Sequence, residues 1–311
     1  MLSTRLGSSD LQVSRVGLGC NNFGMRCDQE QTDRVVGRAL DLGVTLFDTA
    51  DVYGGAGKSE EFLGKALGSR RREIVLATKF GAPMGQGLMG AKASYVARAV
   101  EASLTRLGTD YIDLYQLHFP DPTTPVEETL RALDECVRAG KVRYIGCSNY
   151  SGWQLVEALW TSKHNGLAAY VTAQNQYSLL DRRIERELAE AAKKYTVGIL
   201  PYFPLASGLL TGKYQRGAEP PKGTRLAAMG ARSERFLNDR NMAVVERLQS
   251  FAESRGHTLL ELAFSWLACQ PYVPSVIAGA TRPEQIDANV NAAGWQLSAE
   301  EMSEVDKLTK S

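Results

Sequence analysis

Short apolar runs alternate with longer segments of helical spacing along most of the chain. The apolar runs have the length of buried strands, at residues 16–20, 44–47, 74–78, 112–117, 142–147, 169–173, 197–200 and 273–277. Between them, apolar residues recur every three or four positions, at 28–42, 58–67, 92–106, 126–139, from 151, and 182–195. Strands that alternate with helices predict a parallel sheet. Eight of them in 311 residues predict an α/β fold, a closed (β/α)8 TIM barrel.

Two segments depart from this repeat. Residues 4–6 and 11–13 alternate around a turn at Gly7, which predicts a β-hairpin ahead of the barrel. Residues 203–240 are rich in Gly, Pro and Arg and predict a long loop at the carboxyl-terminal face, where such loops usually serve function. Since no second hydrophobic pattern follows, we expect one domain over 1–311.

Composition and charge exclude several classes of protein. The hydrophobic share of 44% and charged share of 23% are ordinary for a globular protein. A net charge of +1 gives no general attraction to nucleic acid or membranes. The five cysteines contain no CxxC pair, which favours free thiols over disulfides or a metal site. Without a signal pattern or an apolar run of about 20 residues, a cytoplasmic protein is expected.

Four ionisable residues stand at the ends of three consecutive predicted strands. Asp48 and Lys79 each follow an apolar run directly, as does His118, one of only three histidines, and Tyr53 lies just beyond Asp48. Taken singly, each residue has a structural explanation. Asp48 can be a helix cap and Lys79 a surface lysine, while His118 can be a core histidine and Tyr53 a half-buried aromatic. In a parallel barrel, however, the carboxyl ends of strands share one face, where active sites form. We therefore expect these four side chains to meet.

Carbonyl reduction is the chemistry that needs this set. A proton must reach the carbonyl oxygen, and the pKa of tyrosine, near 10, is too high for an efficient acid at neutral pH. The Lys79 ammonium would lower the pKa of Tyr53, and Asp48 would hold Lys79 in place. His118 would donate to the carbonyl oxygen or orient the substrate. Hydride requires a nicotinamide or flavin, and the same residues serve alcohol oxidation in reverse.

Residues at the other strand ends suit a cofactor, although no GxGxxG motif follows the first strand. Ser148, Asn149 and Gln174 can hold a carboxamide, and Tyr202 can stack on a flat ring; the alternative is that they are turn and cap residues. Further candidates for phosphates are Gly208, Lys213 and the segment 279–285. Arg282 in that segment suits a 2′-phosphate, which favours NADP over NAD, unless it is a solvated loop arginine.

Several ordered motifs carry a resemblance to a known family. They are DTADVYG at 48–54 with Ser59-Glu60, TK at 78–79, DLYQLH at 113–118, GCSN at 146–149, QNQY at 174–177, PLASGLLTGK at 204–213 and GATRPEQ at 279–285. On these motifs the chain resembles the aldo-keto reductases along nearly its whole length. It is most similar to the bacterial branch that also resembles potassium-channel β subunits.

The resemblance implies a barrel that reduces aldehydes or ketones with NADPH, NADH being less favoured. It makes Tyr53 the proton donor, tuned by Lys79 and Asp48, while His118 orients the carbonyl. It also implies the cofactor contacts, which are Cys20, Asn21, Asp48, Ser148, Asn149, Gln174, Tyr202, Pro204, Leu205, Ser207, Gly208, Lys213, Arg225, Gly279, Thr281, Arg282, Gln285 and Asn289. One position departs from the family pattern, since Ala288 replaces an acid that contacts adenine.

A second hypothesis is that the protein is a nicotinamide-bound regulatory subunit. Such a subunit would report redox state to a partner and would itself show little turnover. Because the chain keeps His118, we rank this reading below the enzyme. The expected partner is a small-molecule carbonyl or alcohol substrate, and a homo-oligomer remains open.

Overall fold

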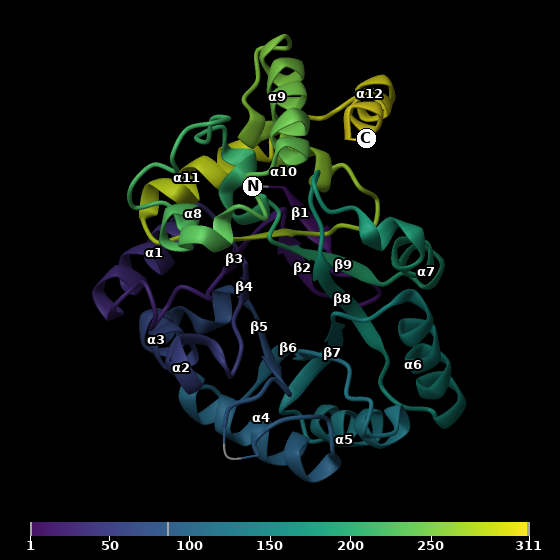
Figure 1. Ribbon diagram of the computed structural model, residues 1–311. Helices are drawn as coiled ribbons and strands as arrows, with labels where there is room; N and C mark the ends of the chain where they lie inside the picture. Colours follow the sequence, from purple (N-terminus) through teal and green to yellow (C-terminus); the bar gives the residue numbers. More distant parts are fainter. Residues whose placement is uncertain (1, 86, 310–311) are drawn as a thin grey trace.

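Eight parallel strands form a nearly closed barrel with helices around it in the computed structural model (Figure 1). The structure describes residues 2–85 and 87–309; the other positions of the expected 1–311 domain lie outside the described residues. In the order of hydrogen bonding the strands are β10 (Val276–Gly279), β3 (Val16–Gly19), β4 (Leu46–Asp48), β5 (Val75–Phe80), β6 (Ile112–Leu117), β7 (Val142–Ser148), β8 (Tyr170–Gln176) and β9 (Gly198–Tyr202). The predicted (β/α)8 barrel is confirmed.

Helices follow the strands as the spacing predicts up to residue 195, and four further long helices, which the spacing does not predict, lie between residues 239 and 309. The long ones are α1 (Gln29–Asp41), α3 (Lys58–Leu67), α4 (Ala93–Leu107), α5 (Val126–Arg138), α6 (Gly152–Asn165), α7 (Leu188–Tyr195), α9 (Asp239–Glu253), α10 (Leu259–Ala268), α11 (Pro283–Ala292) and α12 (Ala299–Thr309). Shorter turns are α2 (Tyr53–Ala56), η1 (Gly68–Glu73), η2 (Arg183–Arg186), η3 (Ala206–Thr211), α8 (Arg225–Ala228) and η4 (Gly230–Ser233). Capping boxes at Asp28 and Ser151 fix the starts of α1 and α6.

Two predicted elements differ from the structure for identifiable reasons. The helix expected over 182–195 is divided, because Glu187 leaves helical geometry and its carboxylate accepts from the backbone N–H of Trp153 at the start of α6. A tertiary contact thus overrides local helical preference. The last strand begins at Val276 instead of Val273, because Val273 still bonds back to Gln270 and Pro274 has no N–H to donate.

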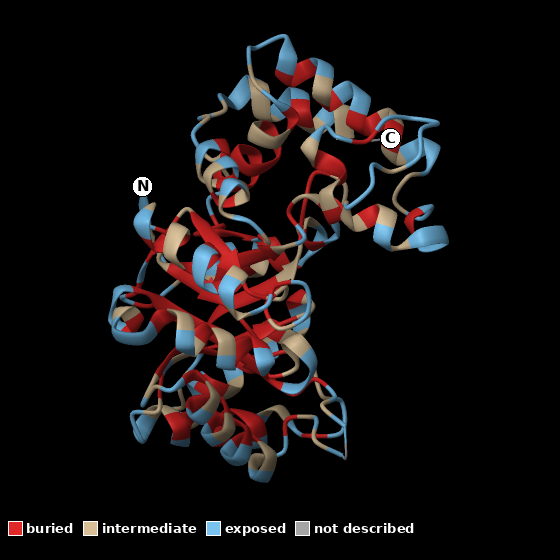
Figure 2. Cartoon of the chain, turned by 90° about the vertical axis from the view of Figure 1, so that its left-hand side faces the viewer, coloured by how far each residue is buried: buried red, intermediate tan, exposed pale blue. Residues whose placement is uncertain are grey.

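The N-terminal hairpin closes one end of the barrel. It consists of β1 (Ser3–Arg5) and β2 (Gln12–Ser14), as predicted within one residue. Leu6, Leu11 and Val13 pack among inward-facing strand residues, and Gly7 approaches so closely that a Cβ there would lie 2.1 Å from the Val171 carbonyl oxygen. Figure 2 shows the burial concentrated in the strands at the centre of the molecule. Across residues 2–85 and 87–309, no helix is both long and apolar enough to cross a membrane.

Candidate active site

The inward-facing positions of the strands change from apolar to polar toward their carboxyl ends. Every second residue of a strand points to the same side. In β4 the inward residues run from Leu46 to Asp48, and in β5 from Ala77 to Lys79. In β6 they run from Leu114 through Gln116. This alternation brings several predicted residues into one layer, namely Asp48, Lys79, Ser148, Gln174 and Tyr202.

An ion pair lies at the centre of this layer. Lys79 Nζ donates to Asp48 Oδ2 at 2.6 Å and to the Thr49 carbonyl oxygen at 2.8 Å, and both charged side chains are buried. The other carboxylate oxygen of Asp48 accepts from Gln116 Nε2 (3.2 Å) and Gln174 Nε2 (2.9 Å). Burial alone would lower the pKa of Lys79, but Asp48 and Tyr53 together raise it above its ordinary value. The ammonium therefore stays charged.

Tyr53, the first residue of α2, lies against this ion pair. Its ring centroid is 5.1 Å from Lys79 Nζ. Burial raises the pKa of the phenol, Lys79 lowers it, and Asp48 raises it, so that the pKa ends above its ordinary value. Lys79 therefore acts in the expected direction but does not outweigh burial. The phenol is fully protonated at neutral pH and available as a donor.

His118 faces Tyr53 from the end of β6. The two rings meet edge to face with centroids 5.7 Å apart, and the imidazole stacks on Phe119 at 4.8 Å. Burial, and then the charge of Lys79, lowers the pKa of His118 to about 3, so the ring is neutral and carries one N–H donor. Its Nδ1 has no hydrogen-bond partner among the described residues.

The residues expected to hold a carboxamide lie beside His118 and bond to one another. Asn149, with φ of +61°, donates from Nδ2 to the His118 carbonyl oxygen (2.9 Å) and to Ser148 Oγ (3.1 Å). Tyr202 Oη donates to Asn149 Oδ1 at 2.7 Å, and Ser148 Oγ donates to the Gln174 carbonyl oxygen. The cluster therefore connects the ends of β6, β7, β8 and β9. It is in place, with its side chains oriented by internal bonds.

The loop after β9 has the shape of an anion cradle. Its backbone has positive φ at Phe203 and at Ala206, Ser207 and Gly208 in succession. A Cβ on Gly208 would lie 3.4 Å from Lys213 Nζ and 3.6 Å from Tyr214 Oη. Tyr214 is buried and its hydroxyl has no partner among the described residues. The Lys213 ammonium and the unpaired Tyr214 hydroxyl thus lie beside Gly208 and can bind an anion, whereas the N–H groups of Ala206 and Gly208 already donate to the carbonyl oxygens of Phe203 and Leu205.

Two residues near this cradle were not anticipated from the sequence. Tyr214 carries no pattern of its own and could have been found only by its position after Lys213. Arg26 lies near the predicted Arg225, since it lowers the Arg225 pKa after burial, and Arg225 itself covers the Phe203 ring at 4.9 Å. The predicted Pro204 and Leu205 belong to the same loop, and the Leu205 carbonyl oxygen accepts from the Gly208 N–H.

The segment after β10 meets the loop after β3. Asn21 Oδ1 is 3.0 Å from the position of a Cβ on Gly279, and Cys20 is buried with its N–H bonded to the Asp48 carbonyl oxygen. Gln285 accepts from the N–H and hydroxyl of Thr281, which shapes the turn before α11. Two more predicted residues lie at this end, the buried Asn289 and the exposed Arg282. Within residues 2–85 and 87–309, Arg282 has no ion-pair partner.

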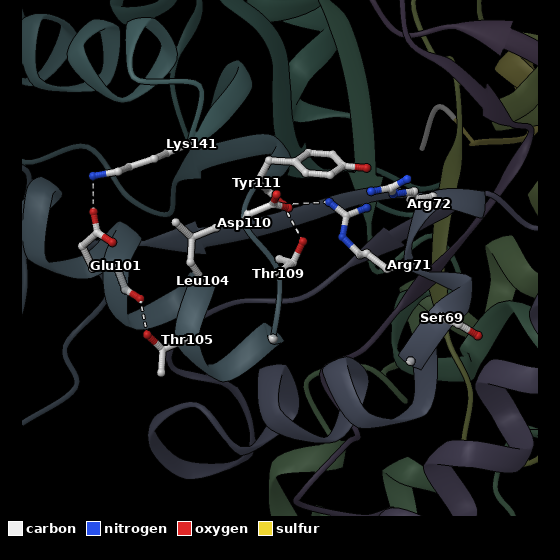
Figure 3. Close-up of a pocket in the computed structure, with 12 residues that line it drawn as sticks. Ser69, Arg71, Arg72, Glu101, Leu104, Thr105, Thr109, Asp110, Tyr111 and Lys141 are labelled. Carbon is white, nitrogen blue, oxygen red and sulfur yellow. Dashed lines mark hydrogen bonds and ion pairs between the residues drawn. The ribbon is translucent and has the colours of Figure 1, made fainter.

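A cavity lies at the opposite end of the barrel (Figure 3). It measures about 770 Å³ and is lined by η1, the end of α4 and the residues that lead into β6 and β7, among them Arg72, Tyr111 and Lys141. Its cations are largely used, because Arg71 pairs with Asp113 and Lys141 with Glu101. None of the predicted site residues lines it, so we place the active site at the carboxyl ends of the strands.

Comparison with known proteins agrees with this geometry. The family model described as "Aldo/keto reductase family" matches residues 15–310. An uncharacterized oxidoreductase of Bacillus subtilis is 36% identical over 309 residues, covering 96% of this chain and 92% of that protein. A probable voltage-gated potassium channel subunit beta of Arabidopsis thaliana is 37% identical, covering 92% and 89%. The L-glyceraldehyde 3-phosphate reductase of Escherichia coli O157:H7 is 34% identical, covering 97% and 90%. The chain belongs to the aldo/keto reductase family.

Proposed function

We propose that the protein reduces an aldehyde or ketone to the alcohol with NADPH, reversibly, and that Tyr53 donates the proton. The observation that carries this proposal is the arrangement of three groups around Tyr53: Lys79, held by Asp48 at 2.6 Å, lies beside the Tyr53 ring, and a neutral His118 meets that ring edge to face. Membership of the family and relatives named as oxidoreductases support the reaction class.

Each side chain has a defined part in the proton transfer. The Tyr53 hydroxyl gives its proton to the carbonyl oxygen as negative charge develops there. The Lys79 ammonium then stabilises the phenolate, and Asp48 keeps that ammonium in position. His118 donates a hydrogen bond that orients the carbonyl, with no change of charge near neutral pH because its pKa is lowered to about 3. A nicotinamide, when bound, supplies the hydride.

The cofactor side of the site fits a nicotinamide dinucleotide. The cradle at Gly208, with Lys213 and the unpaired Tyr214 hydroxyl, suits a pyrophosphate. Ser148, Asn149 and Gln174 would orient the carboxamide and Tyr202 would cover the ring. The exposed cation of Arg282 at the start of α11 supports a preference for the 2′-phosphate of NADPH.

A redox-sensing subunit is the second candidate, because some relatives carry the name potassium channel subunit beta. That name describes those proteins. The complete set of Asp48, Tyr53, Lys79 and His118 supports turnover by this chain.

The test is NADPH oxidation with a panel of aldehydes by wild type and Tyr53→Phe. We expect kcat/KM to fall by about 10²–10⁴-fold in the variant, with NADPH affinity retained. Tyr144→Phe, at the other end of the barrel where Tyr144 bonds to Asp10, should match wild type. Equal rates for wild type and Tyr53→Phe on every substrate would reject the proton-donor role.

A further inference from the structure

A second buried carboxyl group lies behind Tyr53 and has no part in the proposed reaction. Asp51 is 1% exposed, and neither of its side-chain oxygens has a hydrogen-bond partner among the described residues. Its backbone N–H donates to the Lys79 carbonyl oxygen at 3.0 Å, and the Tyr53 N–H donates to the Ala50 carbonyl oxygen. Asp51 therefore belongs to the turn that joins the proton donor to the lysine-bearing strand.

Ionisable groups face Asp51 from every element packed against it. They are Glu60 from α3, Tyr95 and Arg106 from α4, Lys79 from β5 and Tyr115 from β6. Three of these are already engaged, since Lys79 donates to Asp48, and Glu60 accepts from Arg106 Nε at 2.7 Å and from the Thr78 hydroxyl at 2.6 Å. The buried Tyr115 hydroxyl also has no partner among residues 2–85 and 87–309.

This environment opposes a negative charge on Asp51. Removing a carboxylate from water without a partner is costly, and Glu60 adds repulsion from a second buried carboxylate. Burial first, and then Glu60, raises the pKa of Asp51 to about 7, although Arg106, the Val52 N–H and Lys79 lower it. Asp51 therefore changes charge near neutral pH.

We propose, on the basis of the reductase function above, that Asp51 is a positioning residue. Its neutral carboxyl group keeps the 49–53 turn packed against α3 and α4, with Tyr53 and Lys79 in reactive geometry. Ionisation adds repulsion from Glu60 and loosens that turn. A misplacement of about 1 Å in a catalytic group can cost about 100-fold in rate. The rate of carbonyl reduction therefore depends on pH through the charge of Asp51, although Asp51 itself transfers no proton to the substrate.

The sign of the effect on stability follows from proton binding. Unfolded, an aspartate loses its proton near pH 4. Folded, Asp51 keeps its proton up to about pH 7. Between these values the native state binds more protons than the unfolded state, so the Asp51 contribution to stability falls as pH rises from about 4 to about 7.

The experiment compares wild type, Asp51→Asn and Asp113→Asn. Asn is uncharged at every pH and has nearly the shape of the neutral acid. Asp113 is a matched control because it is a buried aspartate like Asp51, but it lies in β6 and binds Arg71 and Arg143 at the far end. Each protein is assayed for kcat/KM with NADPH and an aldehyde between about pH 5.5 and 9, and for melting temperature over the same range.

We expect wild-type kcat/KM to fall roughly tenfold between about pH 6 and 8, within the range that misplacement allows. Neither His118 nor Tyr53 titrates there, because the pKa of the first is lowered to about 3 and that of the second is raised. Asp113→Asn should keep the wild-type profile, whereas Asp51→Asn should be flat. The melting temperature of Asp51→Asn should rise relative to wild type as pH increases from about 5 to 8.

Two results of the activity assay, and one of the melting curves, would overturn the inference. One is a wild-type profile that is flat between about pH 6 and 8, which can be read even if Asp51→Asn does not fold. The other is a decline that survives in Asp51→Asn. The absence of the pH-dependent difference in melting temperature would also overturn it, and that measurement needs no turnover. A wild type that reduces no carbonyl rejects the proposed function separately, whatever the melting curves give.

Discussion

Two buried carboxylates lie at opposite ends of the barrel. They differ in whether the cation that pairs with each one also lies beside a second titratable side chain. Asp48 lies at the mouth and bonds to Lys79 and two glutamine amides. Asp113 lies at the closed end, where it accepts from Arg71 (2.9 Å), the Leu76 N–H (3.0 Å) and Arg143 (3.0 Å). Both are acidic residues of central strands and both are paired with a cation.

The kind of cation explains why the Asp48–Lys79 pair is suited to catalysis and the Asp113–Arg71 pair to stabilising the fold. Arginine is permanently charged and its planar group fits a carboxylate. Arg71 also covers the Tyr111 ring at 4.3 Å, so its guanidinium lies between the Asp113 carboxylate and an aromatic ring. Lysine carries a point charge, and Lys79 lies at once beside Asp48 and beside Tyr53. A buried ion pair indicates function where its cation also faces a titratable group.

The largest expected effect comes from Lys79→Met. Asp48 would be left buried without its cation, which typically costs about 3–5 kcal/mol of unfolding free energy. Carbonyl reduction should fall by at least about 10²–10⁴-fold, because the phenolate would lose its counter-charge. Urea unfolding and steady-state NADPH oxidation measure the two effects. A stable variant with wild-type kcat/KM would contradict our reading of this pair.

Arg71→Met makes the matched change at the closed end. Asp113 would keep Arg143 and the Leu76 N–H, so we expect a smaller loss of about 1–3 kcal/mol in unfolding free energy. With Tyr53 and Lys79 untouched, kcat/KM should equal that of wild type below the melting temperature. A large loss of activity without unfolding would show that the two ends of the barrel are coupled. The Asp113–Arg71 pair could then not be assigned to stability alone.

Arg282→Ala removes a cation that has no carboxylate partner among the described residues, and it should have the smallest effect. We expect the Kd for NADPH to rise about tenfold, since one charge-assisted phosphate contact is lost, and the Kd for NADH to stay the same. Fluorescence titration with both nucleotides measures this. Arg131→Ala, on the exposed surface of α5, is the control. An equal rise in the Kd for NADPH and the Kd for NADH would contradict the proposal that Arg282 binds the 2′-phosphate.

Much of the barrel and the central site could be predicted from the sequence because both follow from apolar runs and from where they stop. Asp48, Lys79 and His118 were found in that way. Gln116 was not predicted as a site residue. It lies two positions before His118, so its side chain points to the same side of β6, and this spacing could have identified it. Asp51 could not be identified from sequence, because its importance comes from burial without a partner. The break at Glu187 likewise depends on a contact with α6.

The hairpin at the closed end has a consequence for proton supply. Leu6, Leu11 and Val13 pack among the inward-facing strand residues and Gly7 lies against the Val171 carbonyl, so the hairpin fills the barrel at the end opposite Lys79. If Tyr53 donates the proton as proposed, its phenolate would be reprotonated through the same opening that admits the substrate. Rehydration of that opening after product departure would then be part of each catalytic cycle.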